Sequence, residues 1–203
     1  MCFQPMRYGQ RVLIIDPGHG GEDGGAVSVT GTAESAINLA IALKMDTFCG
    51  LFGVEHVLTR SSDVSLKDSD ASTLAQMKRT DLYNRVALVE GTSGAVLVSI
   101  HQNYFASGEY SGAQVFFAPT QGSEDWALRC QQLLTTELDP ENHRLSKAIP
   151  KEIYLMNHIS CPAILVEFGF LSHSQEAELL ETDDYQAQIA LTILASYLNE
   201  PFQ

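Results

Sequence analysis

Short apolar runs alternate with longer stretches of helical periodicity along most of this chain. The runs that are typical of strands are residues 11–16 (RVLIID), 54–60, 95–101 (AVLVSIH), 113–118, 152–156 and 163–168 (AILVEF). The stretches that are typical of helices are residues 33–51, 81–90, 123–138, 174–181 and 183–198, and the polar segment 61–80 is expected to be a surface excursion. Strands that alternate with helices predict an α/β fold with helices on both faces of a mostly parallel, twisted sheet.

The length of 203 residues favours one domain. We expect this domain to occupy residues 11–199 and residues 1–10 to be an N-terminal extension. That extension lacks the apolar run of an export signal, and no stretch approaches the ~20 apolar residues of a membrane helix. The 12 Lys and Arg residues against 25 Asp and Glu residues give a net charge of −13. This balance argues against non-specific nucleic-acid binding and against adsorption to anionic lipid.

Unusual polar residues follow three of the expected strands. The loop at residues 16–26 (DPGHGGEDGGA) contains His19, residues 95–101 end in His101, and Glu167 lies near the exit of residues 163–168. Ligands of open α/β sheets gather outside the carboxyl ends of the strands. The sequence therefore predicts that these side chains meet at one edge of the sheet.

The glycine-rich loop could be read as a phosphate cradle or as a flexible surface loop. It matches neither G-x-G-x-x-G nor G-x-x-x-x-G-K-[ST], and Glu22 and Asp23 would repel a phosphate. Glycines around a single histidine instead favour a tightly bent backbone that holds His19 over the sheet edge.

Two histidines and a carboxylate suffice for a catalytic zinc site, which uses three protein ligands and one water. His19 and His101 supply two ligands, and Glu34, at the start of the helix that follows the glycine loop, is a candidate for the third. An acidic residue is also favoured at a helix N-terminus by the helix dipole alone. Both interpretations of Glu34 are consistent with its position.

Glu167 is a carboxylate inside the apolar sequence AILVEFGFL. A buried glutamate needs a compensating partner or a chemical task. An internal ion pair with Arg60 or Arg85 would supply the partner. The functional alternative is a general base that faces a water held by the metal, with a pKa set by partial burial and the nearby cation.

Several motifs occur together in a consistent order: DPGHGGEDGGA at residues 16–26, Glu34 with Asn38, LTR at 58–60, SIHQN at 99–103 and VEFGFLS at 166–172. In this the chain resembles the zinc-dependent N-acetylmuramoyl-L-alanine amidase family of peptidoglycan hydrolases, from about residue 12 to about residue 198. The segments DLYNRV, GAQVFFAP and EIYLMNHISCPAILVE are most similar to its spore-cortex, germination-type branch. Ser35 and His173 depart from residues common in the family, but neither is a ligand position.

The resemblance implies that His19, Glu34 and His101 bind one zinc ion and that Glu167 is the catalytic carboxylate. It also suggests that Asn103 and Arg60 orient the substrate or the groups around the metal. The implied reaction is hydrolysis of the amide between N-acetylmuramic acid and L-alanine in peptidoglycan. Two alternatives are a zinc peptidase of similar architecture and a non-catalytic cell-wall-binding relative.

The implied substrate lies outside the cytoplasm. We therefore expect an extracytoplasmic protein, in the cell wall, the periplasm or the forespore intermembrane space, and a chain that was trimmed at its start. If the germination-type assignment holds, the setting is the spore cortex during sporulation and germination, and an activating protein partner is expected.

Overall fold

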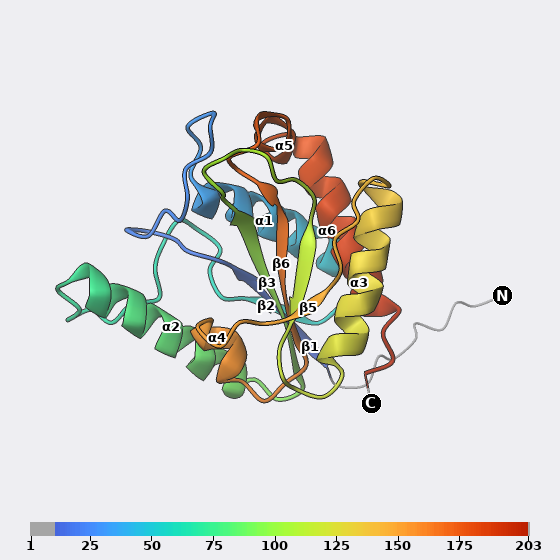
Figure 1. Ribbon diagram of the computed structural model, residues 1–203. Coiled ribbons are helices and arrows are strands. Elements are labelled where there is room, and N and C mark those ends of the chain that lie inside the picture. The colour runs from blue at the N-terminus through green and yellow to red at the C-terminus, as the bar shows by residue number, and fades with distance from the viewer. Residues whose placement is uncertain (1–10, 203) are drawn as a thin grey trace.

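A computed structural model describes residues 11–202 of the chain, so the predicted N-terminal extension lies outside the described residues (Figure 1). Its sheet has six strands in the order β2-β1-β3-β6-β4-β5. The strands are β1 (Val12–Pro17), β2 (His56–Leu58), β3 (Ala95–Asn103), β4 (Gln114–Phe117), β5 (Lys147–Ala148) and β6 (Ala163–Phe170). The first four in spatial order are parallel, β4 is antiparallel to β6, and β5 is parallel to β4.

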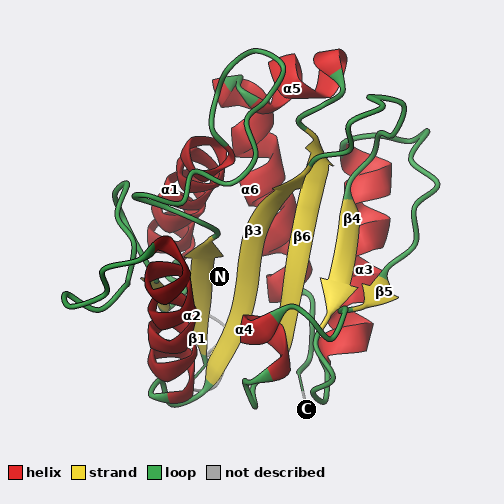
Figure 2. Ribbon diagram, turned by 60° about the vertical axis from the view of Figure 1, so that its left-hand side comes forward, coloured by secondary structure: helices red, strands yellow, loops and turns green. Residues whose placement is uncertain are grey.

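Helices cover both faces of this sheet (Figure 2). One face carries α1 (Glu34–Phe52), α3 (Ser123–Glu137) and α6 (Asp183–Leu198), and the opposite face carries α2 (Leu74–Glu90) and α4 (Tyr154–Asn157). The short α5 (Ser174–Leu180) lies beyond the carboxyl end of β6. The prediction of a single α/β domain with a mostly parallel sheet is confirmed.

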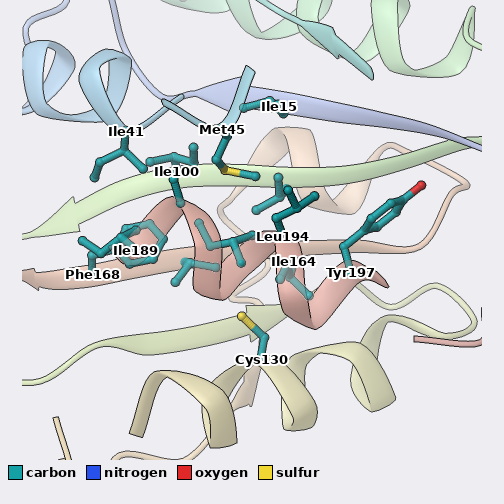
Figure 3. Packing of buried hydrophobic residues seen from close by; sticks show 14 of the residues in the cluster. Ile15, Ile41, Met45, Ile100, Cys130, Ile164, Phe168, Ile189, Leu194 and Tyr197 are labelled. Carbon is teal, nitrogen blue, oxygen red and sulfur yellow. The ribbon is translucent and has the colours of Figure 1, made fainter. Parts of the chain in front are cut away.

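The apolar strand residues divide between two cores because successive side chains of a strand point to opposite faces. Ile15, Ile100 and Ile164 belong to the larger cluster, which α1, α3 and α6 close (Figure 3). Ile14 and Leu97 belong to the smaller cluster under α2 and α4. Burial on both faces explains why the central strands are nearly continuous apolar runs.

Helix α1 is long and apolar enough to cross a membrane by length and composition alone, which the sequence analysis did not anticipate. In the structure it packs against β1, β3 and α6. Its buried side includes Glu34, Asn38 and Met45, and it ends at Gly53 in the left-handed conformation (φ 67°). These contacts make α1 a core helix of the domain.

Two local predictions were wrong. Residues 152–156 were expected to form a strand, but they lead into helix α4, whose Leu155 and Met156 fill the smaller core instead of pairing with the sheet. Helix α2 begins at Leu74 within the segment expected to be a surface excursion. Its start is stabilised by a capping box between Thr73 and Gln76.

Candidate metal centre and groove

The carboxyl edge of the sheet concentrates polar side chains on the face covered by α2 and α4. Three polar residues each come two positions after a strand residue of the smaller core: Asp16 after Ile14, Ser99 after Leu97 and Glu167 after Leu165. Two-residue spacing keeps them on the same face. The register pairs Asp16 with Ser99 and His101 with Glu167. The predicted meeting of His101 and Glu167 at one sheet edge therefore follows from strand register.

His19, Glu34 and His101 converge at this edge. Glu34 Oε1 lies 3.2 Å from His19 Nε2 and 3.1 Å from His101 Nδ1. One ligand atom from each residue lies within 4.8 Å of the others, and Glu34 is buried. The structure thus brings together the three residues proposed as ligands from the sequence, and Glu34 does more than favour a helix terminus.

The glycine loop leaves no room for side chains beside these groups. A Cβ on Gly18 would lie 2.2 Å from His101 Cε1, and a Cβ on Gly25 would lie 2.5 Å from Glu34 Oε2. His19 itself has φ 62°, the left-handed conformation that residues other than glycine seldom adopt. Such strain persists where the surroundings enforce it, often at functional sites. The predicted role of the loop, to hold His19 over the sheet edge, matches this geometry.

The electrostatics of the cluster favour an ionised Glu34. Burial alone would raise the pKa of Glu34, but His101 and His19 hold it far below its usual range. Burial alone would lower the pKa of His19, whereas hydrogen bonds and charge interactions with Glu34 and Asp23 raise it to about 9. Asp23 Oδ2 lies 3.0 Å from His19 Nδ1, so it fixes the orientation of that ring.

Glu34 has further support from two backbone N–H groups and from the neighbouring Asn38. The Gln102 backbone N–H donates to Glu34 Oε1 over 3.1 Å, and the Ala26 N–H donates to Oε2 over 3.0 Å. Asn38, which belongs to the quoted motif, donates to the Gly18 carbonyl over 3.3 Å. Because Asn38 lies four residues after Glu34 on α1, the sequence could have predicted that the two side chains are neighbours.

Glu167 has a buried oxygen, Oε2, that has no hydrogen-bond partner among the described residues. Burial raises the pKa of Glu167 to about 7, an effect that His101 moderates and Glu34 reinforces. The alternative in which Glu167 pairs with Arg60 or Arg85 is wrong, because both guanidinium groups contact other residues. An unpaired carboxylate with a pKa near neutrality is suited to proton transfer.

Arg85 is buried and pairs with two carboxylates. It lies 2.5 Å from Asp16 and 2.7 Å from Asp81, and it also donates to the His19 carbonyl over 2.8 Å. Asp16 in turn accepts from Thr59. Burial would raise the pKa of Asp16, but Arg85 and its hydroxyl partners hold it below its usual value. The Arg85–Asp16 pair could not be predicted from the sequence, whereas the Asp81–Arg85 contact could, because the two residues lie four apart on a helix.

Arg60 lies against the backbone of the glycine loop. Its guanidinium donates to the carbonyls of Pro17 (3.0 Å), Gly18 (3.0 Å) and Ser35 (2.9 Å). Asn103 lies at the end of β3, where its side chain accepts from the Tyr104 N–H over 2.9 Å. The contacts of Arg60 support the part of the prediction that concerns groups around the metal.

A groove of about 330 Å³ opens beside the candidate metal centre. His19, His101 and Glu167 line one end of it, and α2 and α4 form its walls. Sequence reasoning missed this groove because it assigned neither the first two turns of α2 nor the helical state of α4.

Comparison with known proteins assigns the chain to a family. The sequence profile described as N-acetylmuramoyl-L-alanine amidase matches residues 13–198. The chain is a member of the N-acetylmuramoyl-L-alanine amidase family. The predicted family and enzyme class are confirmed.

Two relatives place the amidase near one branch of that family. The chain is 34% identical over 189 residues to the germination-specific N-acetylmuramoyl-L-alanine amidase of Bacillus subtilis, covering 93% of this chain and 78% of the relative. It is 35% identical, with a TM-score of 0.89, to the CwlD amidase of Clostridioides difficile, which was solved in complex with the GerS lipoprotein. That alignment covers 94% of this chain and 98% of the other. A second Clostridium difficile amidase is 27% identical, with a TM-score of 0.80, over 93% of this chain and 95% of its own.

Proposed function

We propose that this amidase hydrolyses the amide between N-acetylmuramic acid and L-alanine in peptidoglycan, with Glu167 as the general base beside a zinc ion. The observation that carries the proposal is the convergence of two imidazoles and two carboxylates at one sheet edge, one carboxylate facing both histidines and the other unpaired. We also assign the catalytic domain to residues 11–199.

The donor set fits zinc. His19, Glu34 and His101 would hold the ion, because neutral imidazole nitrogen and carboxylate oxygen are zinc ligands and three protein ligands leave a position for water or substrate. When bound, zinc acts as a Lewis acid that polarises a carbonyl and lowers the pKa of a coordinated water to about 7. The ionised state of Glu34 favours cation binding.

Glu167 performs the proton transfers. As the water oxygen bonds to the scissile carbonyl carbon, Glu167 accepts the proton that the water loses. It then donates this proton to the alanine nitrogen as the carbon–nitrogen bond breaks, so the products are a free carboxylate on the lactyl group and a free amine on alanine. A pKa of about 7 suits both steps, because the ideal catalytic pKa lies near the working pH.

The relatives support a setting in the spore cortex, outside the cytoplasm. One is named as germination-specific, and the structure of another was solved in complex with a lipoprotein. We therefore extend the proposal to cortex peptidoglycan as the substrate and to an activating protein partner for this chain.

Digestion of purified peptidoglycan tests the function. New N-terminal L-alanine with intact glycan strands supports the amidase. A new amine on any other residue would indicate a zinc peptidase, and no product in the presence of zinc would indicate a non-catalytic relative. Glu167→Gln serves as the control variant in the same digest.

A further inference from the structure

One face of helix α2 forms a wall of the groove. Its lining residues follow helical spacing, so a single stripe of the helix faces the cavity: Leu74, Met77, Lys78, Asp81, Leu82 and Arg85. The opposite wall is the segment at residues 152–156. Both walls combine apolar and charged residues, and the charged residues of the stripe line the groove.

Lys78 is the accessible cation of this groove. The groove's other Lys or Arg side chain, among the residues the structure describes, is Arg85, which is 2% exposed and held between Asp16 and Asp81. The Lys78 side chain is 57% exposed, and its ammonium lies 2.9 Å from Asp23 Oδ1. An ammonium has three donors, so further hydrogen bonds remain available.

Lys78 is also connected to the metal centre through Asp23, which limits the distance between them. Asp23 links the two, because its Oδ2 contacts His19 Nδ1 at 3.0 Å while its Oδ1 contacts Lys78 Nζ. Two contacts across one carboxylate place Lys78 Nζ within about 8 Å of His19 Nδ1, the ring nitrogen that faces away from Glu34. A substrate that places its amide at the centre can therefore reach Lys78 through the first few residues beyond that amide.

The peptide that is released by the reaction carries a carboxylate a short distance from the scissile amide. In a stem peptide the L-alanine is followed by D-glutamate, whose α-carboxylate is not part of the chain. Consecutive Cα atoms are about 3.8 Å apart, so this carboxylate lies about 5–8 Å from the scissile carbon. The groove is otherwise acidic, with Glu22, Asp23 and Glu152 on its lining, and would repel such a group without a cation.

We propose that Lys78 binds the α-carboxylate of the second stem-peptide residue and so selects stem peptides that carry a free acid at that position. This proposal rests on the proposed function and adds a specificity-determining residue to it. Asp23 holds the Lys78 ammonium near the cleaved bond.

The test compares two soluble muramoyl-peptide substrates that differ at one group, D-isoglutamate against its amide, D-isoglutamine, with the zinc-loaded enzyme. We expect the wild type to prefer the acid by about tenfold in kcat/KM, the size of a charge-assisted hydrogen bond discounted for exposure. Lys78→Met removes this preference by raising KM for the acid, with kcat unchanged and the amide substrate within twofold of wild type. Lys78→Arg keeps most of the preference. The control is Lys147→Met, which removes an exposed lysine of β5 outside the groove.

Three results would overturn the proposal. The first is a wild type that does not discriminate between the two substrates, and the second is a Lys78→Met enzyme that still does. The third is an equal loss of kcat on both substrates with reduced zinc content, which would mean that Lys78 acts through Asp23 and His19. A wild type that cleaves neither substrate at the muramoyl amide contradicts the proposed function instead, so the two failures are distinguishable.

Discussion

The buried pair between Arg85 and Asp16 offers the most direct test of how the glycine loop is held. Arg85→Met removes the cation from an aspartate that is 1% exposed and also removes the donor to the His19 carbonyl. Breaking a buried ion pair from one side costs about 3–5 kcal/mol because it leaves an uncompensated charge. A domain of this kind has a stability of about 5–15 kcal/mol, so the loss is a large fraction of the total.

Urea unfolding at pH 7 measures this loss. Trp126 is the single tryptophan and is fully buried in the larger core, so its fluorescence reports global unfolding. With a slope of about 2 kcal/mol per molar urea, a loss of about 4 kcal/mol lowers the midpoint by about 2 M. Arg79→Met, an exposed arginine on the same helix, is the matched control and should change stability by less than about 0.5 kcal/mol.

The pH dependence gives an independent check. The folded-state pKa of Asp16 lies below the ordinary 3.8, so its ion pair contributes stability above that value and loses it as the pH falls. In Arg85→Met, burial without the cation raises the pKa of Asp16. The difference between variant and wild type should therefore be largest near neutrality and shrink as the pH is lowered toward 4.

A double-mutant cycle completes this test. Asp16→Asn combined with Arg85→Met should cost about 2–3 kcal/mol less than the sum of the two single changes, because the double variant no longer leaves a buried Asp16 charge without its cation. A loss below about 1 kcal/mol for Arg85→Met, or additive effects in the cycle, would refute the reasoning.

Three further predictions concern the metal centre. Gly18→Ala should displace the His101 imidazole, because the added Cβ would lie 2.2 Å from Cε1 of that ring. Calorimetric titration should then show zinc binding weakened about 10–100-fold. An unchanged affinity would show that the ring is free to move. Glu167→Gln should lower kcat by at least about 10²-fold while metal analysis finds zinc retained, and substantial residual turnover would remove Glu167 from its role. Zinc binding at pH 7 should release protons, because the pKa of His19 in the metal-free protein is about 9. The apparent affinity for zinc should therefore fall as the pH drops from 9 to 6. Calorimetry in buffers of different ionisation enthalpy would detect the proton release, and its absence would contradict the raised pKa.

Local sequence patterns predicted most of the fold. Strands β1, β3 and β6 and helix α6 follow from runs and periodicities that a single stretch of chain contains. Helix α4 was missed because four residues carry no measurable periodicity, and its helical state depends on burial of Leu155 and Met156. The start of α2 could have been read from its capping box, since both partners lie within four residues of each other.

The residues of the candidate site could also be predicted from local sequence, whereas their contacts could not. The sequence by itself determined which residues could bind a metal and that His19, His101 and Glu167 lie at or near the carboxyl ends of strands, because strand ends and glycine turns are local features. Only the tertiary structure decided their partners: the Glu34 contacts with both imidazoles, the Arg85–Asp16 pair and the distance from Lys78 to His19 join residues far apart in the chain. These contacts depend on strand order and helix placement, which the packing of the whole domain sets. The sequence thus identified the residues that could bind a metal and transfer a proton, and the packing of the domain formed the groove that lies beside them.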